Sequence, residues 1–187
     1  MLRLWECSDD YPDRLVGEYD ENSSSDRFLL TKGLSLRETW KPARILFEAS
    51  AEELRHWDCL LNTTLVPLVS ERTRQLLERE SNEIEFLQAS VETISGTLEQ
   101  FSILNATRAV AALDHTSSVY KKIRGTDSIL SFSKLVYREE LMDGSAIARS
   151  ADYPPHLLIA KNLADKLIAA TISGLRLVTP EEISIAP

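Results

Sequence analysis

The sequence contains few of the residues that catalytic, cofactor-binding and metal-binding sites usually require. Its 187 residues include only two cysteines, three histidines and six glycines. The glycines are too scattered for a GxGxxG motif or a phosphate-binding loop, and neither HExxH nor CxxC is present. No G-x-S-x-G elbow places a serine for nucleophilic attack. We therefore expect no catalytic, cofactor-binding or metal-binding residues, and we expect that the protein is not an enzyme.

Long apolar runs are also missing. No stretch reaches the roughly 18 apolar residues of a membrane helix. The first residues, MLRLWECSDD, lack the apolar core of a signal peptide. Two cysteines define no disulfide framework. These absences predict a soluble, cytoplasmic protein with free thiols.

One weak metal signal remains in the sequence. His56 and Cys59 stand three residues apart on an expected helix, which is the spacing of half a zinc site. The other ligands would have to come from unpatterned positions, such as His115 or His156. Ordinary packing of a helix-end histidine beside an apolar cysteine is the competing interpretation, and we favour it.

Charge is the strongest compositional feature. The net charge is −8, which disfavours nucleic acid and anionic membranes as partners and suits a basic protein partner. Eight acids lie between Glu6 and Asp26 against a single base, Arg14, so this segment carries −7. Residues 1–30 are expected to form an acidic strand and loop region, which is either simply solvated or a contact surface. Trp40 could anchor a partner or pack in the core. The candidate partner-binding residues are Asp9, Asp10, Asp13, Glu18, Asp20, Glu21 and Trp40.

Two segments resemble each other, residues 65–87 and 155–177. Each begins with a short apolar run, continues with helical spacing of apolar residues, and ends with an alternating pattern. This change of period predicts two strand–helix–strand units that pack together or share a sheet. Chance likeness of two amphipathic stretches is the alternative. Ser70 would cap the first helix, and Gly174 would end the second.

The remaining patterns predict more strands than helices. We therefore expect an α+β fold in which residues 1–187 form one domain of mixed strands and a few short helices. Ser50 and Glu53 form a capping-box signature for a helix over 49–60. Asn105 would cap a second helix over 106–113. The expected strands include an edge strand over 2–5, one over 27–30, a short one at 119–120, and a hairpin of 129–138 with 145–149 that turns at Asp143-Gly144.

Several short motifs occur in a fixed order from Gly33 to Leu177. They are G-L-S-L followed by W-K-P (33–42), D-C-L (58–60), P-L-V-S-E-R with L-L (67–77), F-S-I-L-N with A-A-L-D (101–114), and S-G-L-R-L (173–177). In this order they resemble an immunity-protein family of bacterial polymorphic toxin systems. Two features depart from the family pattern. Ile159-Ala160-Lys161 replaces a V-S-E opening and removes a serine cap, and the acidic segment has no counterpart.

The resemblance implies an immunity protein that neutralises a cognate toxin by direct binding, without catalysis. An acidic face would then provide specificity and fast association, and a few buried anchors would provide affinity. One alternative is a non-catalytic structural or regulatory protein-binding module, which could be a homo-oligomer. The other is an enzyme whose site is assembled from dispersed polar residues.

Overall fold

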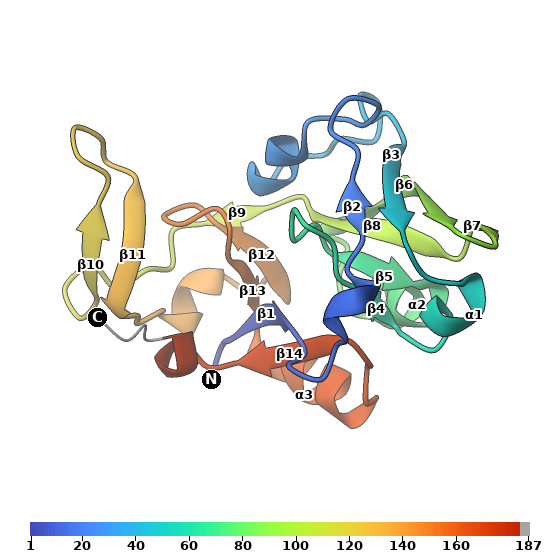
Figure 1. Cartoon of the computed structure of the whole chain (residues 1–187). Coiled ribbons are helices and arrows are strands. Elements are labelled where there is room, and N and C mark those ends of the chain that lie inside the picture. Colours follow the sequence, from blue (N-terminus) through green and yellow to red (C-terminus); the bar gives the residue numbers. More distant parts are fainter. Residues whose placement is uncertain (184–187) are drawn as a thin grey trace.

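The computed structural model describes residues 1–183, whose strands form three β-sheets with short helices packed against them (Figure 1). The α+β class predicted from the sequence is confirmed. Within the described chain the α-helices are α1 (Ala51–Leu54), α2 (Glu71–Glu80) and α3 (Lys161–Ala169). None of the described helices is long and apolar enough to cross a membrane.

The largest sheet has seven strands in the order β2-β3-β6-β8-β5-β4, with β7 also pairing with β6. Its centre is apolar because alternate residues of β3 (Ala43, Ile45 and Phe47) are buried on one face. β3 and β6 run parallel, and the other pairs are antiparallel. The strand bounds are β2 (Glu18–Tyr19), β3 (Ala43–Phe47), β4 (Cys59–Leu60), β5 (Leu68–Ser70), β6 (Ile84–Thr93), β7 (Gly96–Leu98) and β8 (Phe101–Ala106).

The second sheet has five strands in the order β14-β1-β13-β12-β9. The predicted edge strand at residues 2–5 is therefore wrong in its position, because β1 lies between two partners. Leu4 pairs with Leu158 on one side and with Val178 on the other. The strand bounds are β1 (Arg3–Cys7), β9 (Ala109–Val110), β12 (Ile147–Ser150), β13 (Leu157–Ile159) and β14 (Leu175–Val178).

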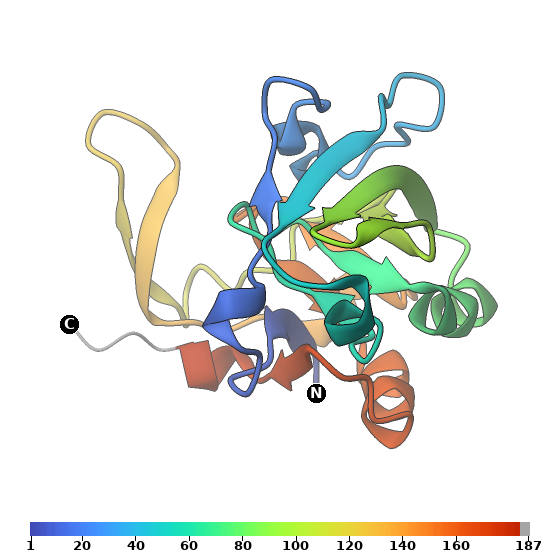
Figure 2. The same cartoon turned by 45° about the vertical axis from the view of Figure 1, so that its right-hand side comes forward.

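The third sheet is a two-stranded ribbon of β10 (Val119–Lys122) and β11 (Ile129–Lys134). We call residues 119–134 the hairpin arm. It stands away from the rest of the molecule in both views (Figures 1 and 2). The predicted hairpin of 129–138 with 145–149 is wrong, because β11 pairs with the preceding strand while β12 pairs with β13 and β9. Asp143 and Gly144 do form a left-handed turn, but it follows a 3₁₀ helix.

The two similar segments each contain a strand, a helix and a strand in that order: β5-α2-β6 and β13-α3-β14. In each segment the two strands are separated by a third strand that runs antiparallel to both: β8 lies between β5 and β6, and β1 lies between β13 and β14. Both are thus split β-α-β arrangements. They share one apolar cluster, in which Val69 and Leu77 of the first meet Ile159 and Leu163 of the second. That one segment duplicates the other stays a prediction.

Three other local predictions are wrong or only partly right. The predicted strand at 27–30 is a 3₁₀ helix, because the Asp26 side chain accepts a hydrogen bond from the Phe28 amide. The helix expected over 49–60 is a single turn, since the chain turns away to form β4. The helix expected over 106–113 is absent because Ala106 pairs with Ile84 in the large sheet. The 3₁₀ helices are η1 (Asp13–Leu15), η2 (Arg27–Thr31), η3 (Glu139–Met142) and η4 (Pro180–Ile183).

Candidate protein-binding surface

Asp58 joins the two split units at one point. Its side chain is only 13% exposed and accepts hydrogen bonds from the Ser70 hydroxyl (3.1 Å) and from the Ser173 amide (3.1 Å). Ser70 is the N-cap of α2, and its side chain also accepts from the Thr73 amide, as the capping motif predicts. One carboxylate therefore connects the start of α2 with the loop that follows α3.

Arg72 strengthens the same junction from the solvent side. Its guanidinium pairs with Asp58 at 2.6 Å and donates to the carbonyl of Ala170, at the C-terminal end of α3. Such a cation favours the negative end of a helix. The helices are also connected by an ion pair between Lys166 and Glu80. Much of the S-E-R motif is thus structural.

Gly174 allows the loop after α3 to approach β4 closely. A Cβ atom at this position would lie 2.2 Å from the carbonyl oxygen of Cys59, and φ is +80°. The residue that ends α3 in the left-handed region is instead Thr171, with φ 51°. The prediction that Gly174 stops the helix is therefore wrong, and its role is close packing.

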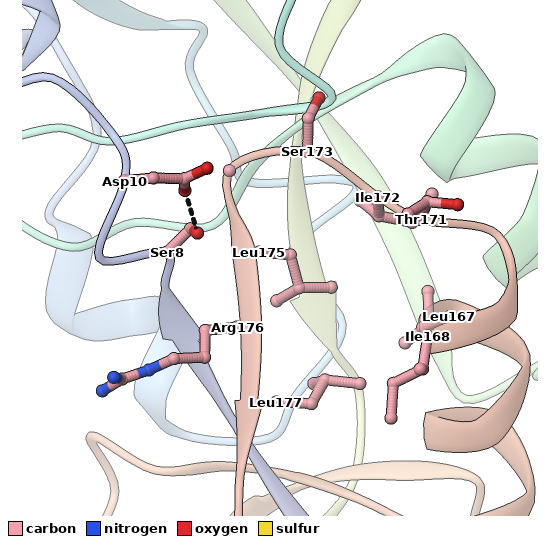
Figure 3. Close-up of a pocket in the computed structure, with 11 residues that line it drawn as sticks. Ser8, Asp10, Leu167, Ile168, Thr171, Ile172, Ser173, Leu175, Arg176 and Leu177 are labelled. Atoms are coloured by element: carbon pink, nitrogen blue, oxygen red, sulfur yellow. Dashed lines mark hydrogen bonds between the residues drawn. The ribbon is translucent and has the colours of Figure 1, made fainter.

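A pocket of about 450 Å³ opens beside this loop, between α3 and β14 (Figure 3). Figure 3 shows Leu175 and Leu177 of β14 on the same side of the strand as Ile168 of α3, while Arg176 points the other way. Ser8 and Asp10 form its polar rim and are hydrogen-bonded to each other. The pocket is a partly apolar recess next to acidic residues, which suits contact with another protein.

The predicted acidic residues fall into separate groups. Asp9 pairs with Arg176 at the rim of this pocket. Asp20 pairs with Arg44 at 3.2 Å, and hydrogen bonding from Ser23 is the largest cause that lowers the pKa of Asp20. Glu21 pairs with Arg27 at 3.1 Å. These three charges are partly neutralised within the chain.

Asp13 and Glu18 are different, because both are exposed and neither forms an ion pair among the described residues. Arg14, next to Asp13, pairs with Glu53 of α1 at 2.5 Å, which brings η1 against that helix. Glu18 is in register with Leu46, two residues before Glu48. Glu48 and Glu52 are likewise exposed and unpaired within the described chain. We call these four residues the acidic patch: Asp13, Glu18, Glu48 and Glu52.

Sequence reasoning missed half of this patch. Glu48 and Glu52 lie outside the acidic segment, and the pairing of β2 with β3 and the Arg14–Glu53 ion pair place their elements beside β2 and η1. The available signal was the capping box of Ser50 and Glu53, which the structure confirms with both reciprocal hydrogen bonds. A helix that begins there exposes its acidic first turn.

Trp40 is half-buried and packs against the main core cluster. Its indole N–H donates to the backbone carbonyl of Gln88 at 3.1 Å. The loop that carries Trp40 is also held by Glu85, a buried carboxylate. Glu85 accepts hydrogen bonds from the Leu36 amide (2.5 Å) and from the Asn105 side chain (2.8 Å). The G-L-S-L and W-K-P motifs therefore hold this loop against β6. Asn105 serves this contact, not the predicted helix cap.

The suggested zinc ligands have other environments. Cys59 is buried, and burial raises the pKa of its thiol well above the usual value, whereas His56 is exposed. Their neighbour Asp58 is engaged by Ser70, Arg72 and Ser173. Across residues 1–183 no group of three or more histidine, cysteine or acidic side chains is arranged to hold a metal ion.

The other two histidines serve different contacts. His115 lies at the base of the hairpin arm, between the Tyr120 hydroxyl (2.9 Å) and Asp152 (3.0 Å). His156 is buried, contacts the Tyr137 hydroxyl at 2.9 Å, and lines a second pocket of about 270 Å³. Burial, together with the smaller effect of the Arg149 charge, lowers the pKa of His156 to about 4. It is therefore neutral at physiological pH.

Comparison with known protein families agrees with the resemblance seen in the order of the motifs. No curated protein matches the chain. A family model, described as Immunity protein family (Imm11), matches residues 12–181. This span includes both split units, the Asp58 junction and the acidic patch. It also covers the acidic segment from residue 12 onward, contrary to the expectation that this segment has no counterpart in the family. The chain therefore belongs to the Immunity protein family (Imm11).

Proposed function

We propose that this protein neutralises a cognate bacterial toxin by binding to it directly in the cytoplasm, without catalysing a reaction. The observation that carries the proposal is the family match over residues 12–181. The chemistry of the described surface supports it. Its exposed features are charged patches and a shallow apolar recess, as expected for a protein-binding surface.

The acidic patch is the proposed contact surface for the toxin. Its four carboxylates have no cation of their own within the described chain, so their field extends into solvent and would attract a basic toxin surface. Asp10 lines the pocket, and Asp9 pairs with Arg176 of the same lining. Ile168, also in the lining, is 56% exposed and could serve as an apolar anchor. Asp20, Glu21 and Trp40 would support the surrounding loops.

Co-expression with the toxin encoded by a neighbouring gene tests the function directly. We expect growth to be rescued and the two proteins to co-purify. Toxicity that persists despite abundant, folded protein would contradict the proposal. Rescue without any complex, at protein concentrations well above that of the toxin, would instead contradict direct binding.

Charge neutralisation tests the contact surface. The double variant Asp13→Asn/Glu18→Gln should lower the association rate with the toxin by about tenfold at low salt and flatten its salt dependence. Stopped-flow binding at several ionic strengths measures both effects. The matched control is Glu38→Gln/Glu99→Gln, which removes the same charge from exposed, unpaired acids elsewhere. Equal effects of the two variants would remove the acidic patch from the interface.

A further inference from the structure

The hairpin arm is the most isolated element of the described chain. β10 and β11 pair only with each other, so both outer edges of the ribbon are free of strand partners within residues 1–183. A two-stranded ribbon is marginally stable by itself in water. Its base is nevertheless firmly held, because Phe132 is 3% exposed and its ring packs edge-on against Tyr120 and Tyr153.

The arm has a charge opposite to that of the whole protein. It contains four cations against Asp127, which gives +3 in a chain of −8. Lys122 pairs with Asp127 at 2.9 Å. The other three cations have no ion pair among the described residues: Lys121, Arg124 and Lys134.

Apolar side chains are exposed beside these cations. Val119 is 56% exposed, Ile123 44% and Leu130 59%. Lysines on a free strand edge often serve only to prevent aggregation. That role does not require exposed β-branched and leucine side chains next to them. A basic ribbon with apolar contacts between its charges fits an acidic protein surface.

We propose that the hairpin arm docks onto the acidic patch of a second copy of this chain. The complement is present on the same molecule: the patch offers four carboxylates without ion pairs, and the arm offers three such cations. Among the described residues, no ion pair joins arm and patch within one chain. A two-fold axis would let each copy give its arm to the other, so that the contact closes as a dimer.

The arm of a second copy and the toxin would compete for the acidic patch, so dimerisation is measured on the protein alone, without the toxin. Analytical ultracentrifugation of the purified full chain should show a monomer–dimer equilibrium at about 50 mM NaCl. At about 500 mM NaCl the dissociation constant should rise by tenfold or more, because screening weakens exposed charge pairs. A monomer at every concentration in low salt would overturn the inference.

Charge reversal identifies the surfaces. The arm variant Lys121→Glu/Lys134→Glu and the patch variant Asp13→Lys/Glu18→Lys should each be monomeric alone. An equimolar mixture of the two should form a dimer again, since the unmodified arm then faces the unmodified patch and the reversed arm residues face the reversed patch residues. This gain of association cannot come from misfolding. The control variant Lys32→Glu/Lys41→Glu changes exposed lysines elsewhere and should dimerise like the unmodified protein.

Two further outcomes would decide against the second copy. Folded single variants that remain dimeric would show that the interface lies elsewhere. A mixture that stays monomeric, together with loss of toxin binding in the arm variant, would assign the arm to the toxin. Neutral variants with glutamine at Lys121 and Lys134 should weaken the dimer less than the glutamates do, and an equal or larger effect would argue against a charge-based contact.

Discussion

At the scale of single residues, the buried polar side chains decide how the protein responds to pH. His156 is stacked near Phe132 and packed against Tyr153, and its imidazole contacts the Tyr137 hydroxyl. Neighbouring Arg149 is also buried, and burial lowers the pKa of its guanidinium to about 10. His156 and Arg149 thus lie together below the surface, where burial disfavours the protonated, positively charged form of each side chain.

The low pKa of His156 predicts a loss of stability in mild acid. Between pH 6.5 and about 4 the unfolded chain binds a proton at this residue and the native protein does not, so stability falls as the pH falls. The contribution is fully present above pH 6.5 and is worth up to about 3 kcal/mol. Urea unfolding of the unmodified protein and of His156→Asn across this range should show a shallower pH dependence for the variant.

A histidine at the surface provides the control for this measurement. His56→Asn makes the same substitution at an exposed position, so it reports what removal of a histidine does outside the buried site. Parallel curves for the unmodified protein and for His156→Asn would show that His156 titrates normally in the native state.

At the scale of elements, the contacts that determine the fold are the close approaches between segments distant in sequence. The loop after α3 reaches β4 only because Gly174 has no side chain. The same loop provides Ser173, which donates to Asp58. Secondary-structure propensity cannot predict the approach of Gly174 to β4 or the hydrogen bonds from Ser173 to Asp58, although these contacts hold the two split units together.

Two glycine variants separate backbone strain from steric exclusion. Gly174 and Gly144 have nearly the same φ, +80° and +79°, but only at Gly174 would an added Cβ have other atoms within 4 Å. Each change to alanine carries about 1 kcal/mol of left-handed strain. Gly174→Ala should lose at least about 2 kcal/mol more than Gly144→Ala, because the Cys59 carbonyl must move. Denaturant midpoints measure the difference, and equal losses would contradict the packing role.

The sequence predicted well the features that depend only on residues close together in the chain. The capping box of Ser50 and Glu53 depends on residues three apart and was correct. Asn105 is an equally suitable N-cap residue, but Ala106 pairs with Ile84 in the sheet, so no helix follows. The side-chain amide of Asn105 donates to Glu85 instead. Alternation in residues 2–5 identified the buried face of β1, yet period-2 patterning cannot report which edges are paired. The pattern could likewise not report that β2 pairs with β3, which sets Glu18 opposite Leu46, two residues before Glu48.

At the scale of the whole molecule, the sheets connect the two ends of the described chain. β1 pairs with β13 and β14, and Arg3 also forms an ion pair with Glu182 at 3.8 Å. The cluster shared by the split units links the five-stranded sheet to the seven-stranded sheet. We therefore propose that residues 1–183 fold as one domain; residues 184–187 of the predicted domain lie outside the described residues.

One domain predicts one unfolding transition. Trp5 lies in β1 and Trp40 packs against the core of the large sheet, so tryptophan fluorescence reports on both sheets. Its thermal unfolding curve should coincide with that of far-UV circular dichroism. Disrupting β1 with the substitution Leu4→Asp should lower both midpoints together by more than about 10 °C. Separate transitions would indicate two independent units.

The position of β1 has a consequence for protein synthesis. Residues 3–7 are synthesised well before their partners in β13 and β14, which lie far along the chain at residues 157–178. In the nascent chain, β1 therefore stays without its strand partners until those segments have emerged. The five-stranded sheet can therefore close only after residues 157–178 have been synthesised.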